Sequence, residues 1–197
     1  MNGKLSIAQF ESLPDCLYKS NYIDMLLFLC NLKPAVRFFL TDSVAKNKMI
    51  LWCNQNKYKA VLHKDRIIYI SKSFILSNLV RCIDNTSNKH EYILGLLLGY
   101  PRCCCRKISL IGEENIDSFE TKMRVLNQYY DEFKLINPAG YTAGLAYISH
   151  IPCSNKCIKS LKIAKTTQAI VNQNINKGSF AQWRSLYNND VNSDTEK

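Results

Sequence analysis

The sequence lacks the features that mark secreted and membrane-spanning chains. Its first ten residues, MNGKLSIAQF, hold no basic segment followed by an apolar run, so no signal peptide is predicted. The longest apolar stretch, residues 22–32, contains Asp24 and Asn31 and is shorter than the roughly 20 residues of a membrane-spanning helix. We therefore expect a cytoplasmic protein without a membrane segment.

The sequence also lacks the glycine-rich and serine-centred motifs of common enzyme classes. It contains no Walker, Rossmann or nucleophile-elbow pattern, and the GxxxG at residues 95–99 is more typical of close helix packing than of a phosphate loop. No repeat period and no internal low-complexity linker divide the chain. We expect one α+β domain over residues 1–178 and a polar, partly disordered tail over residues 179–197.

Acidic residues are few compared with basic ones. The 197 residues include 26 Lys and Arg against 16 Asp and Glu, a formal net charge of +10. Such an excess indicates an anionic partner, either nucleic acid or a small anionic metabolite. A lysine-rich surface from an AT-biased genome explains the same excess without any partner, and the abundance of Lys, Asn and Ile favours that explanation.

Apolar residues make up 47% of the chain and charged residues 21%, enough for a sizeable core. Dense apolar spacing predicts a buried helix over residues 22–32. Short runs rich in aromatic and branched side chains, separated by polar turns, predict strands at 36–40, 49–53, 57–63 and 66–71. Helical spacing returns at 73–83, 90–98, 116–135 and 155–175. We expect an α+β fold, with a small N-terminal antiparallel sheet and a mainly helical C-terminal half.

The nine cysteines are an odd number, and in a reducing compartment we do not expect structural disulfides. Four of them lie among apolar neighbours, as buried thiols do: Cys16, Cys30, Cys53 and Cys82. The other five gather in two segments, GYPRCCCRK and HIPCSNKC: Cys103, Cys104, Cys105, Cys153 and Cys157. These five carry the functional prediction.

Both segments resemble helix starts. In the first, Gly99 ends one helix and Pro101 is of the type favoured at the first position of the next. In the second, Ser154 is a good N-cap, which places Cys157 at the third helical position. Unpaired amides and the positive end of a helix dipole favour the thiolate, which is both a nucleophile and a metal ligand.

Consecutive helical residues diverge by about 100°, so three adjacent cysteines cannot all face one centre. We expect Cys103 and Cys104 to act with Cys153 and Cys157 as ligands of a metal or cofactor, and Cys105 to be the extra thiol. Four thiolates suit zinc or an iron–sulfur cluster, although the spacing contains no C-x₂-C pair. Metal-free thiol or persulfide chemistry, and plain packing of buried thiols, stay open as alternatives.

The leading hypothesis is an enzyme that acts on a small anionic substrate beside this centre. His150 would be a further ligand or a general base, and Arg102, Arg106 or Lys107 would neutralise the substrate's charge. The alternative is a nucleic-acid-binding protein with a structural cysteine centre. For that alternative a basic helix would bind phosphates through four lysines at three-residue spacing: Lys156, Lys159, Lys162 and Lys165.

Taken together, the two segments resemble an uncharacterised prokaryotic domain-of-unknown-function family. That family carries a G-Y-P-x-C-C signature and a downstream H-x-P-C-S-x-x-C-x-x-S signature. The matching residues here are Gly99, Tyr100, Pro101, Cys103, Cys104, His150, Pro152, Cys153, Ser154, Cys157 and Ser160. The resemblance implies a shared site but no particular reaction. Cys105 is an additional cysteine, which leaves open which pair of the three acts.

Overall fold

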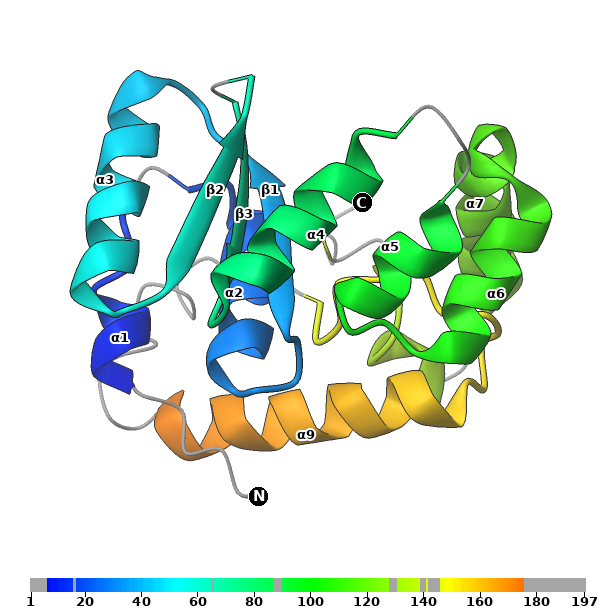
Figure 1. The fold of residues 1–197 in the computed structure, drawn as a ribbon. Coiled ribbons are helices and arrows are strands. Elements are labelled where there is room, and N and C mark those ends of the chain that lie inside the picture. Colours follow the sequence, from blue (N-terminus) through cyan, green and yellow to red (C-terminus); the bar gives the residue numbers. More distant parts are fainter. Residues whose placement is uncertain are drawn as a thin grey trace.

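The computed structural model describes residues 7–15, 17–64, 66–86, 90–127, 131–138, 141 and 146–175. It is an α+β fold, as expected, with a three-stranded antiparallel sheet early in the chain and helices elsewhere (Figure 1). Within these ranges no helix combines the length and the apolar character that a membrane span requires. The expected tail over residues 179–197 lies outside the described residues.

The sheet has the order β1-β3-β2, built from β1 (Ala35–Phe39), β2 (Lys59–His63) and β3 (Ile67–Ser71). β2 and β3 form a hairpin, and β1 pairs antiparallel with the other edge of β3. Side chains alternate between the two faces, as the two-residue period of a strand requires. One face packs with α2 (Lys19–Leu29) and the other packs against α4 (Phe74–Asp84). The sheet is therefore the middle layer of the N-terminal half.

One expected strand is wrong, because residues 49–53 lie inside the helix α3 (Ser43–Gln55). The helix begins at Asp42, whose carboxylate accepts a hydrogen bond of 2.8 Å from the amide of Ala45. Its buried residues are Ala45, Met49, Trp52 and Cys53. These positions recur at intervals of three and four, which is the helical period. The branched and aromatic residues of MILWC are typical of a strand, but the helical spacing of the buried side chains agrees with the helix that forms.

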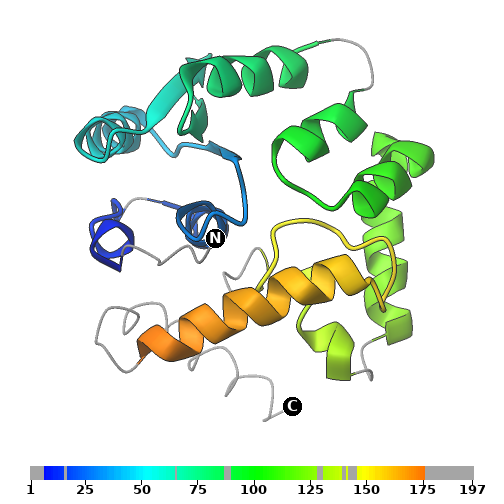
Figure 2. The same ribbon diagram turned by 60° about the horizontal axis from the view of Figure 1, so that its bottom comes forward.

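The remaining helices are short, apart from the last one. They are α1 (Ile7–Glu11), α5 (Glu91–Leu97), α6 (Arg102–Ile111), the 3₁₀ turn Glu113–Asn115, α7 (Ile116–Asn127), α8 (Asp131–Lys134) and α9 (Ile158–Ile175). The helix expected over 116–135 is described in the parts α7 and α8, and residues 128–130 lie outside the described part. Figure 2 shows α9, in orange, beside the yellow segment that leads into it.

Three of the four scattered cysteines are described. Cys30 and Cys53 are buried, as expected of core thiols, and burial raises the pKa of each to about 12. Cys82 is exposed on α4, so the expectation of a core residue is wrong there. Cys16 lies outside the described residues.

The turn between α5 and α6 depends on a glycine. Gly99 has φ +82°, and a Cβ at this position would lie 2.5 Å from Cδ of Pro34. No other residue combines that backbone conformation with so close an approach. The amide of Tyr100 donates to the carbonyl of Gly95 at 2.9 Å and closes the turn. The start of α6 is thereby held against residues 32–34.

Candidate metal centre

The first cysteine segment forms the first turn of α6, as predicted. Pro101 is the N-cap, and its carbonyl accepts hydrogen bonds from the amides of Cys104 and Cys105 at 2.8 and 3.0 Å. The helix begins at Arg102, one residue later than the sequence indicated. Cys103 is half-buried, while Cys104 and Cys105 are buried.

The second cysteine segment is a turn that immediately precedes α9. The amide of Cys157 donates to the carbonyl of Ser154 at 3.2 Å, and the carbonyl of Cys157 accepts from the amide of Leu161 at 2.9 Å. Cys157 therefore occupies the N-cap of α9 rather than its third position. The sequence places the helix start three residues too early, because Ser154 serves the turn instead of the helix.

The two segments bring four sulfur atoms together. The Sγ atoms of Cys103, Cys104, Cys153 and Cys157 all lie within 4.8 Å of one another. Cys157 lies 3.7 Å from Cys103 and 3.7 Å from Cys104, and the latter two are 4.0 Å apart. This group could hold a metal ion, and it is the set of four that the sequence singled out.

The side chain of Cys105 does not belong to this four-sulfur group. Its Sγ lies 3.5 Å from the carbonyl of Tyr100, and a Cβ added to Gly95 would come within 2.8 Å of it. The thiol of Cys105 therefore packs against α5, in the space that Gly95 leaves because it has no side chain. Burial raises the pKa of Cys105 to about 11, so the thiol stays protonated at neutral pH.

Ser160 and His150 form a hydrogen-bonded chain that leads away from the sulfur group. The hydroxyl of Ser160 lies 3.4 Å from Sγ of Cys104 and 2.9 Å from Nε2 of His150. Burial, with the charge of Lys33 as a second cause, lowers the pKa of His150 to about 3, so the imidazole is neutral. His150 thus contacts the centre through Ser160 and is not one of the four clustered side chains.

The protonation preferences of the four thiols differ. Burial raises the pKa of Cys104 well above its usual range and that of Cys153 to about 11. Burial acts on Cys157 in the same direction, but there hydrogen bonds from Ser160 and from the thiols of Cys153 and Cys104 outweigh it and lower the pKa to about 7. Without a metal, the thiolate is therefore favoured at Cys157 over Cys104 and Cys153. A divalent cation is the usual means of deprotonating such a group completely.

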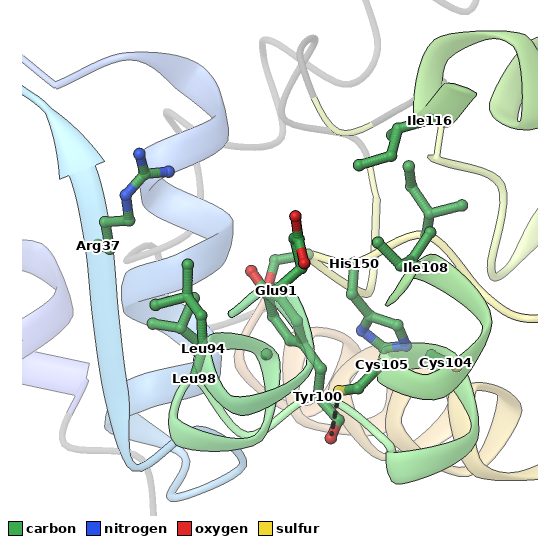
Figure 3. Close-up of a pocket in the computed structure, with 13 residues that line it drawn as sticks. Arg37, Glu91, Leu94, Leu98, Tyr100, Cys104, Cys105, Ile108, Ile116 and His150 are labelled. Atoms are coloured by element: carbon green, nitrogen blue, oxygen red, sulfur yellow. Dashed lines mark hydrogen bonds between the residues drawn. The ribbon is translucent and has the colours of Figure 1, made fainter. Parts of the chain in front are cut away.

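A cavity of about 280 Å³ adjoins the centre between α5, α6 and the segment before α9 (Figure 3). Its walls are mainly aliphatic, with a few polar groups. The lining residues are Arg37, Glu91, Leu94, Gly95, Leu98, Tyr100, Cys104, Cys105, Ile108, Ile116, Ser149, His150 and Ile151. Ser149, His150 and Ile151 also line a second cavity of about 390 Å³.

The three cations expected to neutralise a substrate do not line either cavity. Arg102, Arg106 and Lys107 are exposed on α6. The guanidinium of Arg102 donates to the hydroxyl of Tyr92 at 2.9 Å, and the ammonium of Lys107 lies over the ring of Phe119. Their structural surroundings give no support to a role inside the pocket.

A buried polar network beside the cavity was missed by the sequence analysis. The ammonium of Lys33 donates to the carboxylate of Asp24 and, at 3.0 Å, to the hydroxyl of Ser149. Tyr141 donates to the same carboxylate. Burial lowers the pKa of Lys33, but the charge of Asp24 reverses the shift, so the lysine remains charged. The only sequence signal was a charged Asp24 within a dense apolar run.

No protein-family model, no curated protein and no solved structure matches this chain. The resemblance of the two cysteine motifs to a prokaryotic family therefore stays a prediction. The functional conclusion rests on the geometry of the four sulfur atoms and of the cavity beside them.

Proposed function

We propose that this protein binds one zinc ion through Cys103, Cys104, Cys153 and Cys157. The observation that carries the proposal is the spacing of the sulfur atoms. Tetrahedral zinc with Zn–S bonds near 2.3 Å separates its sulfur ligands by about 3.8 Å. The three pairs among Cys103, Cys104 and Cys157 lie at 3.7, 3.7 and 4.0 Å, and Cys153 lies within 4.8 Å of each, so one ion fits with little adjustment.

The same spacing favours a single ion over an iron–sulfur cluster. In a cluster the cysteines are distributed over several iron atoms, and the inorganic core stands between the sulfur ligands. Four sulfur atoms that are all within 4.8 Å of one another lie closer together than such a core would hold them, which supports a single ion. Among the two cofactors that the sequence left open, we therefore propose zinc.

A zinc ion with four thiolate ligands has no open position for water or substrate. Its role here is structural and electrostatic. The ion would join the start of α6 to the start of α9 across a sequence separation of 54 residues. It would also place two negative charges in excess beside the cavity. The enzyme that we expected from the sequence would thus carry out its reaction in the cavity and not on the metal.

A second candidate is nucleic-acid binding, and it rests on α9. Lys156, Lys159, Lys162 and Lys165 are all exposed, beginning next to the cysteine turn. Such a row suits phosphate contacts, and the anionic partner expected from the net charge would bind on this face.

Single-stranded RNA and duplex DNA of mixed sequence should then bind with an affinity that falls steeply with salt. Binding that is absent, or that is insensitive to salt, would rule this candidate out.

The zinc proposal is tested by elemental analysis of protein purified under anaerobic conditions. We expect one zinc per chain in the wild type and in Cys105→Ser, and a loss of zinc in Cys104→Ser and Cys157→Ser. Cobalt substitution should give the intense charge-transfer and visible bands of a four-thiolate site.

Two results would contradict the proposal. A brown protein with several irons per chain would favour a cluster. A folded wild type that takes up neither zinc, cobalt nor iron would favour metal-free thiol chemistry, for which the lowered pKa of Cys157 is the supporting observation.

A further inference from the structure

We propose that the cavity beside the cysteine centre binds a small aliphatic primary ammonium compound. Among the described residues, two acceptors on side chains that line this largely aliphatic pocket have no hydrogen-bond partner, and they carry this inference. They are the carboxylate of Glu91 and the Nδ1 atom of His150. The inference rests in part on the proposed zinc site, because the ion fixes the orientation of hydrogen bonds behind His150.

The hydrogen-bond chain from the sulfur group decides which nitrogen of His150 carries the proton. With the metal bound, Cys104 is a thiolate and can only accept. The hydroxyl of Ser160, 3.4 Å away, then donates its single proton to sulfur. The same hydroxyl must accept from Nε2 of His150 at 2.9 Å, so Nε2 carries the hydrogen. A neutral imidazole has only one, which leaves Nδ1 as an acceptor.

Glu91 supplies the charge. Figure 3 shows its carboxylate directed into the cavity from the start of α5. Within the described part of the chain this carboxylate has no hydrogen bond or ion pair, although Glu91 is half-buried. Arg37, which lines the cavity, is paired with Asp84 at 2.6 Å. Lys33, which donates to the lining residue Ser149, is paired with Asp24. The pocket therefore holds one unmatched negative charge of its own.

The cysteine centre, with zinc bound, would add further negative charge beside the cavity. Four thiolates and one divalent ion carry a net charge of about −2. The sulfur of Cys104 belongs to a residue that lines the cavity. Fields in a low-dielectric pocket are weakly screened, so a cation is favoured there over a neutral or anionic ligand. This preference is opposite to the anionic substrate that the overall charge of the chain indicated.

The walls define the rest of the ligand. Leu94, Leu98, Ile108, Ile116 and Ile151 form an aliphatic lining, and the volume of about 280 Å³ lies near the lower end of the range for small-ligand pockets. An ammonium group has three donors and no acceptor, which matches the carboxylate and Nδ1. Its hydrocarbon part would replace water along the aliphatic lining and gain from burial.

The test uses zinc-loaded full-length protein and three probes with one carbon skeleton: isoamylamine, isoamyl alcohol and isovalerate. By isothermal titration calorimetry we expect isoamylamine to bind at least about tenfold more tightly than the alcohol, and isovalerate not to bind. Glu91→Gln should weaken amine binding by at least about tenfold with no change in zinc content. Glu11→Gln, on the exposed face of α1, makes the same charge change and should leave binding as in the wild type.

Three probes that bind equally, an amine that does not bind at millimolar concentration, or a Glu91→Gln variant with wild-type affinity would each overturn the inference. Zinc content is measured on the same samples, so the two proposals fail separately. A protein that takes up no zinc and still binds the amine through Glu91 contradicts the metal proposal and the role of His150 that depends on it, but supports the ammonium site at Glu91. A protein with one zinc and no amine affinity contradicts only this one.

Discussion

Ser160 is the side chain through which the buried thiols and the imidazole of His150 are connected. It is fully buried on the first turn of α9, and its hydroxyl lies within hydrogen-bonding reach of Cys104 and His150. Its hydroxyl and its backbone amide also lower the pKa of Cys157. Hydrogen-bond partners of this kind orient metal ligands and tune their basicity. Their removal therefore lowers the affinity for the metal even when all the ligands are present.

Ser160→Ala should therefore lower zinc affinity by about tenfold to a hundredfold, without loss of the fold. Competition with a chromophoric chelator measures this affinity. Thr166→Ala is the matched control, because Thr166 lies on the exposed side of the same helix and its hydroxyl donates only to the carbonyl of Lys162. Equal affinities of the two variants would show that Ser160 does not support the centre.

In the metal-free protein, Cys157 should be the most easily alkylated member of the group at neutral pH. Its pKa is lowered to about 7 while that of Cys153 is raised to about 11, and the thiolate is the reactive form. The rate of iodoacetamide labelling should rise with pH and reach half its maximum near pH 7. Mass spectrometry after proteolysis locates the label.

Two comparisons control this labelling experiment. Cys157→Ser should remove the phase with the midpoint near pH 7, and bound zinc should protect the thiol at all pH values tested. A midpoint at the ordinary cysteine value of about 8.5 would mean that the hydrogen bonds around Cys157 do not stabilise the thiolate.

Among the elements, the two cysteine segments could be predicted because each contains a local signal. Pro101, two residues before the first cysteine, indicates the start of α6, and the divergence of consecutive helical side chains excludes one of three adjacent thiols from the site. The exact position of Cys157 could not be predicted. Ser154 fits a helix cap and a turn equally well in sequence, and the structure uses it in the turn.

The errors and omissions have a common physical cause. Residues 49–53 resemble a strand in composition, yet the cap at Asp42 and the three- and four-residue spacing of buried side chains make them helical. In the sequence, Lys33 directly follows the helix expected over residues 22–32. Only tertiary structure brings Ser149 to its ammonium group. Local patterns predict elements, whereas contacts between segments 116 residues apart have no local signature.

Gly99→Ala tests whether the turn between α5 and α6 requires glycine. Alanine at φ +82° is strained, and its Cβ would lie 2.5 Å from Pro34 and 3.2 Å from the backbone of Lys33. We expect a loss of more than about 1 kcal/mol in the free energy of unfolding, measured by urea denaturation. Because the turn holds α6 in place, zinc affinity should also fall.

The matched control is Gly112→Ala, at the other end of α6. Gly112 has φ +80°, but its Cβ would meet only the side chain of the exposed Glu114, which can rotate away. Both positions have φ near +80°, so both variants carry backbone strain, and a larger loss in Gly99→Ala is attributed to the close approach to Pro34. A loss in Gly99→Ala no larger than that in Gly112→Ala would contradict this expectation.

On the scale of the whole molecule, the sheet-bearing half and the cysteine-bearing half meet at Lys33. The ammonium group contacts Asp24 on α2 and Ser149 in the segment that leads to the cysteine turn, and it lies 4.7 Å from the ring centre of Tyr100. Tyr100 in turn packs 5.3 Å from the ring of His150. The buried ion pair therefore fixes the position of the cavity wall relative to the sheet.

Breaking this pair by changing one partner leaves an uncompensated buried charge, which costs about 3–5 kcal/mol. Lys33→Met and Asp24→Asn should each lose about this much stability in urea denaturation. The double variant should lose clearly less than the sum, because neither charge is then left alone, and the difference gives the coupling energy of the pair. Losses that add would mean that the two groups act independently.

Zinc affinity separates a role of Lys33 in joining the two halves from a purely local role. If Lys33 positions both halves, Lys33→Met should also lower zinc affinity, although no hydrogen bond of its side chain within the described residues reaches a cysteine.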